Sequence, residues 1–252
     1  MKIIVIGGTG LIGKKLVSKL TAKGHEAIAA SQSSGVNILT GEGLAEAFNG
    51  AHTVVDVSNS PSFEDTAVLN FFETSTRNIV AAAKAAGIAH YVALSVVGAD
   101  RMADAGYMRA KIAQESLIEA SGVPFTILRA TQFFEFLGAI ADTATQGDTV
   151  RLPSALMQPL AADDVAAAVA DVVLGKPANN IVEVAGPERL PMAEFARKVL
   201  AAKHDPRTVI ADSSAAYFGY TLDDSSLNPA TGNPRIAPTR LDSWLLSTAT
   251  GK

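Results

Sequence analysis

The stretch Gly7-Gly8-Thr9-Gly10-Leu11-Ile12-Gly13 directly follows the apolar run from Lys2 to Ile6 and leads into an amphipathic helical segment. Its glycines Gly7, Gly10 and Gly13 have the spacing G-x-x-G-x-x-G. A glycine turn between a strand and a helix lets the backbone approach a pyrophosphate, and the free N–H groups of the helix N-terminus favour anionic oxygens. A glycine turn without a ligand is the alternative. Because strand, motif and helix coincide, we predict a dinucleotide site that Thr9, Leu11 and Ile12 also line.

Short apolar strands alternate with helical segments through the first half of the chain. The predicted strands cover residues 2–6, 26–30, 53–57, 91–94 and 124–128, and the predicted helices cover residues 11–23, 43–48, 63–86 and 107–120. Continuous apolar strands that alternate with helices are typical of a parallel sheet covered on both faces. The sequence therefore predicts an α/β fold with a doubly wound parallel sheet, the Rossmann fold.

The alternation continues beyond Arg129 with longer connections. Further strands are predicted at residues 149–152 and 181–184, and further helices at 133–143, 163–174 and 241–246. Residues 203–238 are rich in Pro, Asn, Asp, Ser and Gly, which indicates loops. We predict a single domain over residues 1–252, in which a small, loop-rich C-terminal region at about 187–238 forms the substrate side.

Composition excludes several classes of protein. The 252 residues are 48% hydrophobic and carry a net charge of −4, so neither disorder nor binding to nucleic acid or to an anionic membrane is expected. The chain contains no Cys and its four His residues are isolated, so no metal site is predicted. The N-terminus lacks the long apolar region of a signal peptide, and a cytoplasmic location is expected.

The loop after the second predicted strand favours NADP over NAD. An NAD site normally places a carboxylate here for the ribose diol, but this loop reads Ser31-Gln32-Ser33-Ser34. Its three hydroxyls, its amide and its N–H groups could donate to a 2′-phosphate, and no acidic group would repel that phosphate. The loop contains no Arg, so the preference for NADPH rests on these donors alone.

Five stretches together resemble the short-chain dehydrogenase/reductase superfamily, in particular its atypical, NmrA-like branch of NAD(P)H-binding proteins. The resemblance covers roughly residues 1–186, and residues 187–252 carry no motif. The matching stretches are Gly7–Gly13, Leu94–Gly98, Tyr107–Lys111, Ser121–Arg129 and Asp164–Ala166.

The resemblance implies three catalytic residues. Tyr107 matches the acid/base of that superfamily, and Lys111 matches the residue that holds the nicotinamide ribose and lowers the pKa of the Tyr. The i, i+4 spacing also places an ammonium beside the phenol on one helix face. Ser95 is the nearby hydroxyl that would contact a substrate carbonyl, although it could instead only cap a strand. The alternative for Tyr107 and Lys111 is a packed Tyr and a solvated Lys.

Two further residues are candidate cofactor contacts. Asn37 stands where related proteins often have an Asp that contacts the adenine, and an Asn carbonyl could accept the same hydrogen bond, but a turn Asn is an equal alternative. Ser58 follows the third predicted strand and is expected to border the cofactor.

These observations predict an NADPH-dependent oxidoreductase that reduces a carbonyl, a quinone or a conjugated small-molecule acceptor. One alternative is a redox-sensing regulator that binds NADP without turnover. A second is a nucleotide-sugar epimerase or dehydratase. The sequence does not identify the acceptor. It also leaves the oligomeric state open, and a homo-oligomer is one of the alternatives.

Overall fold

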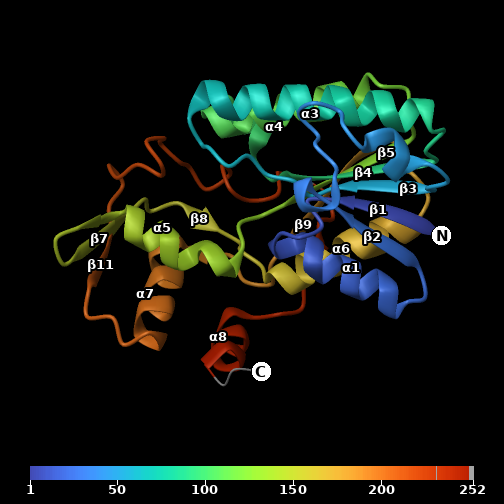
Figure 1. The fold of residues 1–252 in the computed structure, drawn as a ribbon. Helices are drawn as coiled ribbons and strands as arrows, with labels where there is room; N and C mark the ends of the chain where they lie inside the picture. Colours follow the sequence, from blue (N-terminus) through green and yellow to red (C-terminus); the bar gives the residue numbers. More distant parts are fainter. Residues whose placement is uncertain (231, 250–252) are drawn as a thin grey trace. The chain divides into compact units, whose positions relative to one another are not determined.

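The strand before the glycine turn, β1 (Lys2–Ile6), lies inside a seven-stranded sheet of order β12-β9-β5-β4-β3-β1-β2. It pairs in parallel with β2 (Glu26–Ala30) on one side and β3 (Thr53–Asp56) on the other. From β3 the parallel pairing continues to β4 (His90–Val96) and then to β5 (Phe125–Ala130). The predicted α/β fold with a doubly wound parallel sheet is therefore confirmed (Figure 1).

The computed structural model describes residues 1–230 and 232–249. The chain divides into two compact units. The first contains Met1–Ala130 and Val165–Val182, and the second contains Thr131–Asp164 and Glu183–Lys252. The second unit begins at Thr131, where the connections lengthen. The single domain over residues 1–252, with its loop-rich region at about 187–238, stays a prediction.

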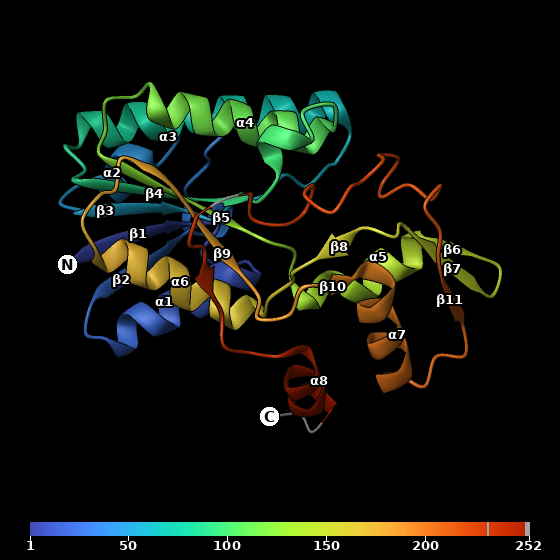
Figure 2. The same ribbon diagram turned by 180° about the vertical axis from the view of Figure 1, so that it is seen from behind.

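The first unit contains β1 to β5 and the helices that cover them. In Figures 1 and 2, α3 and α4 lie on one face of the sheet, and α1 and α6 lie on the other. Both α6 and β9 have residues in both units. The remaining elements are α1 (Leu11–Ala22), η1 (Gln32–Ser34), α2 (Leu44–Phe48), α3 (Asp65–Ala85), η2 (Ala99–Arg101), α4 (Gly106–Glu119), α6 (Ala162–Leu174) and β9 (Asn180–Ala185).

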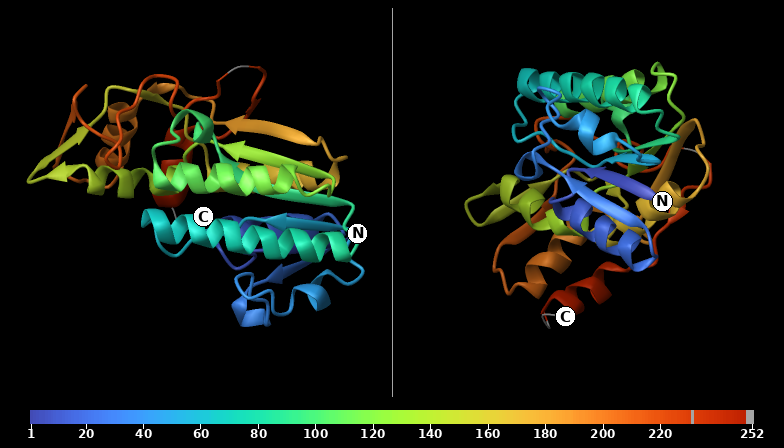
Figure 3. Two further views of the ribbon diagram at one scale, coloured as in Figure 1. Left: turned by 90° about the horizontal axis from the view of Figure 1, so that it is seen from above. Right: turned by 45° about the vertical axis from the view of Figure 1, so that its right-hand side comes forward.

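Apolar spacing explains how these helices attach to the sheet. In α1 the buried residues Ile12, Leu16 and Leu20 recur every fourth position and so form one apolar face. The α3–α4 layer packs on the sheet through a core that includes Ile79 of α3 and Ile118 of α4. Figure 3 shows α3 and α4 side by side along the strands. This packing fixes the face of α4 that carries the predicted catalytic residues.

The second unit is built from short strands and helices. The three-stranded sheet has the order β11-β7-β6, and β8 pairs antiparallel with β10. Its elements are η3 (Phe134–Phe136), α5 (Leu137–Thr143), β6 (Thr145–Gln146), β7 (Thr149–Leu152), β8 (Leu156–Met157), β10 (Leu190–Pro191), α7 (Met192–Ala202), β11 (Thr208–Ala211), β12 (Arg235–Ile236) and α8 (Leu241–Ala249).

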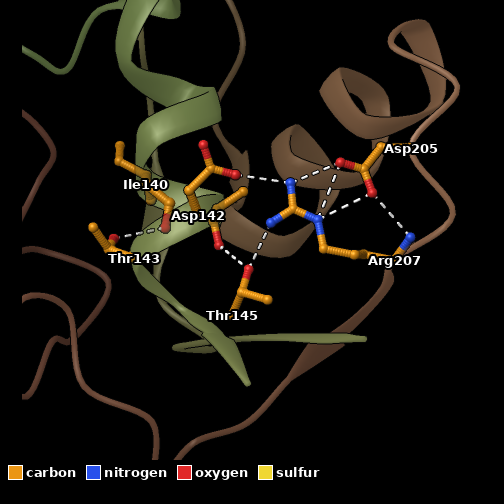
Figure 4. Close-up of polar contacts among 7 residues, drawn as sticks. Ile140, Asp142, Thr143, Thr145, Asp205 and Arg207 are labelled. Carbon is orange, nitrogen blue, oxygen red and sulfur yellow. Dashed lines mark hydrogen bonds and ion pairs between the residues drawn. The ribbon is translucent and has the colours of Figure 1, made fainter. Parts of the chain in front are cut away.

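Arg207 connects three segments of this second unit. Its guanidinium donates hydrogen bonds to Asp142 at 2.8 Å, to Asp205 at 2.7 Å and to the Thr145 hydroxyl at 2.7 Å (Figure 4). These partners come from α5, from the loop after α7 and from β6. The side chain thus joins the end of α5 to the start of β11.

Six of these elements do not appear in the sequence prediction, namely β6, β8, β10, α7, β11 and β12. Neither the helix α7 nor the strand β11 is predicted, and β11 lies within residues 203–238, which the composition assigned to loops. The strand β11 pairs in parallel with β7, some 60 residues earlier in the chain, so its local composition does not reveal it.

Candidate functional site

The glycine turn between β1 and α1 packs tightly against neighbouring backbone atoms. Gly7 has a φ of +74°, and a Cβ added there would lie 2.9 Å from the Cα of Ser58. A Cβ on Gly8 would lie 2.6 Å from the Cα of Ala29, and one on Gly13 would lie 2.2 Å from the carbonyl oxygen of Gly7. These close backbone contacts leave no room for a side chain, so positions 7, 8 and 13 require glycine. Gly10 is different, because a Cβ there would meet only the Gly7 oxygen, at 3.3 Å.

The N-terminus of α1 offers hydrogen-bond donors beside this turn. Gly10 is the N-cap, no side chain caps the helix, and the first turn contains no acidic residue. The N–H of Lys14 bonds the carbonyl of Gly10, so the N–H groups of Leu11, Ile12 and Gly13 precede the first intrahelical bond. A glycine cradle with free N–H groups and no opposing carboxylate fits the pyrophosphate of a dinucleotide.

The serine loop after β2 offers fewer donors than its composition indicates. The Ser34 hydroxyl donates to the Ser31 carbonyl at 2.9 Å and accepts the Ser31 N–H at 2.9 Å. The hydroxyls of Ser31 and Ser33 share one hydrogen bond of 2.8 Å, so one of their two protons stays free for an outside acceptor. The loop begins beside the glycine turn, because the Gly7 N–H bonds the Ala30 carbonyl.

Asn37 stabilises a turn in this structure. Its side-chain oxygen accepts the N–H groups of Leu39 at 3.0 Å and Thr40 at 3.4 Å. The same oxygen was the predicted acceptor for the adenine amino group, and that contact stays a prediction.

Tyr107 lies in the first turn of α4, half-buried among aromatic rings. Its hydroxyl donates to the side-chain oxygen of Asn59 at 3.3 Å. Its ring centroid lies 5.7 Å from that of Phe63 and 6.1 Å from that of Phe72. Burial raises the pKa of Tyr107 to about 12. This direction is opposite to the lowering by Lys111 that the family resemblance implies, and the phenol is protonated at neutral pH.

Lys111 lies one helical turn further along α4 and is almost fully enclosed, with 2% of its surface exposed. Its Nζ donates to the carbonyl of Leu94 at 2.9 Å and to the side-chain oxygen of Gln114, and it lies 4.3 Å from the centroid of the Phe72 ring. Burial lowers its pKa to about 8, against the opposing effect of the Asp56 and Glu115 carboxylates.

The structure brings Tyr107 and Lys111 to one helix face but gives their polar atoms separate partners. Both side chains contact Phe72. Ser95, the third predicted catalytic residue, does not join them. Its hydroxyl is buried and has no hydrogen-bond partner among the described residues. In this state Ser95 presents no exposed oxygen to a substrate, and its predicted substrate contact remains untested.

Sequence reasoning missed two members of this site. Asp56 ends β3 and Gln114 lies on α4, and the two are joined by a hydrogen bond of 2.9 Å from Gln114 Nε2 to Asp56 Oδ2. The predicted residue Ser58 belongs to the same network, since its hydroxyl donates to Asp56 Oδ1 at 2.6 Å. A carboxylate at the end of an otherwise apolar strand was the available signal.

Among residues 1–230 and 232–249, no helix is both long and apolar enough to cross a membrane. Within those same ranges, no group of three His, Cys, Asp or Glu side chains is placed to hold a metal ion.

Residues 7–176 match the family described as NAD(P)H-binding. The chain belongs to this NAD(P)H-binding family. The match begins at the first glycine of the turn and includes Tyr107 and Lys111. The predicted resemblance to NAD(P)H-binding proteins is thereby confirmed, while the choice between NADP and NAD is not decided by it.

Individual relatives of this NAD(P)H-binding chain have different functions. It is 26% identical over 151 residues to the Photosystem II assembly factor Ycf39 of Cyanophora paradoxa, which covers 54% of this chain and 47% of that protein. It is 27% identical over 210 residues to a (4-alkanoyl-5-oxo-2,5-dihydrofuran-3-yl)methyl phosphate reductase of Streptomyces griseus, which covers 76% of this chain and 70% of that protein. The chain thus spans about half the length of the first of these relatives.

A solved structure has the same fold over nearly its whole length. It is a short-chain dehydrogenase/reductase superfamily protein from Agrobacterium tumefaciens with bound NAD, and it matches this chain with a TM-score of 0.75 at 16% identity. The match covers 99% of this chain and 96% of that protein. This likeness agrees with the predicted superfamily fold.

Proposed function

We propose that the chain is an NADPH-dependent oxidoreductase that reduces a carbonyl, quinone or conjugated small-molecule acceptor. The observation that carries the proposal is that Tyr107 and Lys111 share one face of α4 in the unit that also contains the glycine cradle. The Streptomyces relative, named as a reductase, supports the same class of reaction.

The residues that would hold the cofactor all belong to the first unit. The glycine turn and the start of α1 fit the pyrophosphate, the serine loop fits a 2′-phosphate, and Lys111 would hold the nicotinamide ribose. When bound, the nicotinamide supplies a hydride to the acceptor. The proposed binding residues are Gly7, Thr9, Gly10, Leu11, Ile12, Gly13, Ser31, Ser33, Ser34, Asn37, Ser58 and Lys111.

Tyr107 would supply the proton that completes the reduction. Its phenol is protonated at neutral pH, and Asn59 holds its hydroxyl at one end of the aromatic group formed with Phe63 and Phe72. Donation of the proton leaves a phenolate. The ammonium of Lys111, one helical turn away, would stabilise that negative charge.

A screen of NADPH oxidation against aldehydes, ketones, quinones and enones tests the proposal. We expect at least one acceptor class to be turned over, with loss of most of the rate in Tyr107→Phe. If NADPH binds tightly and no class is reduced, the oxidoreductase proposal is wrong.

A redox-sensing regulator is the second candidate, and one observation favours it. The Ser95 hydroxyl is buried and has no hydrogen-bond partner among the described residues, so the predicted contact with a substrate carbonyl is not presented in this state. A relative named as an assembly factor is consistent with such a role. Tight NADPH binding with no turnover in the same screen would support it.

A further inference from the structure

The carboxylate of Asp56 is buried and bonds Gln114 of α4, the helix that carries Tyr107 and Lys111. Only 1% of its surface is exposed, yet its two oxygens accept four hydrogen bonds. Oδ1 accepts the N–H of Ser58 at 2.9 Å and the Ser58 hydroxyl at 2.6 Å. Oδ2 accepts the Tyr91 hydroxyl at 3.3 Å and the Gln114 amide at 2.9 Å. Such complete pairing is what a buried carboxylate requires.

Gln114 connects this carboxylate to the Lys111 ammonium. Its NH₂ group donates to Asp56, and its carbonyl oxygen accepts from Lys111 Nζ. The opposite amide orientation would place the carbonyl against a carboxylate and the NH₂ against an ammonium. Only one orientation therefore satisfies both neighbours, and the amide can join two opposite charges that do not touch.

The same network reaches the dinucleotide turn. The backbone of Ser58 packs so closely on Gly7 that a Cβ on this glycine would lie 2.9 Å from it. The Ser58 N–H and hydroxyl both bond Asp56. A continuous set of contacts thus joins the glycine turn, Ser58, Asp56, Gln114 and Lys111.

We propose that Asp56 and Gln114 are positioning residues that hold the Lys111 ammonium for the cofactor ribose and link its position to the glycine turn. This inference rests on the proposed function. Neither residue needs to touch cofactor or substrate, because both act through Lys111. The third N–H of the ammonium is then left for a cofactor hydroxyl, since two are directed to Leu94 and Gln114.

The first test needs no cofactor. An NMR titration of the Lys111 side chain, assigned by comparison with Lys111→Met, follows its pKa in the folded protein. We expect Gln114→Glu to raise that pKa by adding a negative charge. Gln114→Leu should lower it by removing an acceptor of the charged form, and Asp56→Asn should lower it by removing a charge. An unchanged pKa in all three folded variants would overturn the proposal.

The second test is a double-mutant cycle on NADPH affinity, measured by titration calorimetry. We expect Gln114→Leu to weaken binding about 10-fold in the parent but less than about 2-fold in the Lys111→Met background, because Gln114 acts through that lysine. An equal loss in both backgrounds would show that Gln114 acts independently and would overturn the proposal.

A matched control separates positioning from general loss of stability. Thr126→Val removes a buried hydroxyl of β5 that bonds His90 and the N–H of Ala178, outside the network. We expect it to lower the melting temperature while leaving NADPH affinity and the Lys111 pKa unchanged. If the parent binds no NADPH, the proposed function fails, whereas the NMR titration still reports whether Asp56 and Gln114 hold Lys111.

Discussion

The glycine turn and the Lys111 network lie in the same unit but are built in opposite ways. The turn is made of backbone from seven consecutive residues, and added side chains collide with it within 3 Å at Gly7, Gly8 and Gly13. The network is made of side chains, and Asp56 and Gln114 lie 58 positions apart in the sequence. The turn should therefore tolerate almost no substitution at these three glycines, whereas the network should respond in graded steps to changes of charge and hydrogen bonding.

The sharpest test of this contrast compares two glycines of one turn. We expect Gly13→Ala to lower the free energy of unfolding by roughly 3 kcal/mol or more and to abolish NADPH binding, because its Cβ meets the Gly7 oxygen at 2.2 Å. Gly10→Ala should stay within about 1 kcal/mol, since its φ is −79° and its Cβ has room. Thermal melts and titration calorimetry give both quantities. If Gly13→Ala bound NADPH as tightly as the parent, the backbone contact at Gly13 would not be required for cofactor binding.

The next effect concerns the proton donor. We expect Tyr107→Phe to reduce turnover roughly 10²-fold while NADPH affinity stays within a few-fold, because the ring remains and the acidic hydroxyl goes. Steady-state rates with an acceptor from the screen, together with NADPH titration, measure the two effects. Turnover at the parent rate would mean that solvent supplies the proton.

The third effect is a pH dependence of stability. Burial lowers the pKa of Lys111 from 10.5 to about 8, so between these values the unfolded chain holds a proton that the folded chain has lost. The free energy of unfolding should therefore rise with pH across this window, by a few kcal/mol at most.

The comparison of the parent with Lys111→Met isolates this contribution. Urea unfolding from pH 8 to pH 10 should show the rise in the parent and not in the variant. The window stops at pH 10 because the raised pKa of Tyr107 acts in the opposite direction above it. A rise of the same size in Lys111→Met would assign it to another group.

The smallest effect is expected in the serine loop. Ser31→Asp should weaken NADPH binding by about 10-fold, or about 1.4 kcal/mol, through repulsion of a 2′-phosphate, and should leave NADH affinity nearly unchanged. Calorimetric titration with both nucleotides measures the difference. An equal loss for both would place the phosphate elsewhere.

The sequence predicted those parts of the molecule that local pattern decides. The strand, glycine turn and helix at residues 2–23 agree with the structure to within a residue, since β1 spans Lys2–Ile6 and α1 spans Leu11–Ala22. Tyr107 and Lys111 could be placed on one helix face from their spacing alone. Local pattern could not show that the hydroxyls of Ser31 and Ser34 bond within their own loop.

The parts that escaped prediction depend on contacts distant in sequence. In the sequence, Asp56 is only the polar end of an apolar strand. Its partners Tyr91 and Gln114 are distant in sequence and become neighbours only in the folded chain. The helix α7 has no side-chain cap, and its only local start signals are Pro191 at the N-cap and Glu194 in the first turn, which the sequence analysis did not use. The role of Ser95 stays a prediction, and its motif position could not show that its hydroxyl is buried without a hydrogen-bond partner among the described residues.

Arg207 has a consequence for local opening in the second unit. Its contacts with Asp142, Asp205 and Thr145 are partly exposed, so each contributes little alone. Together they tie the end of α5 and the strand β6 to the start of β11, which also pairs with β7. Amide protons of these segments should consequently exchange with solvent as one cooperative unit, at a common rate set by release of this single guanidinium.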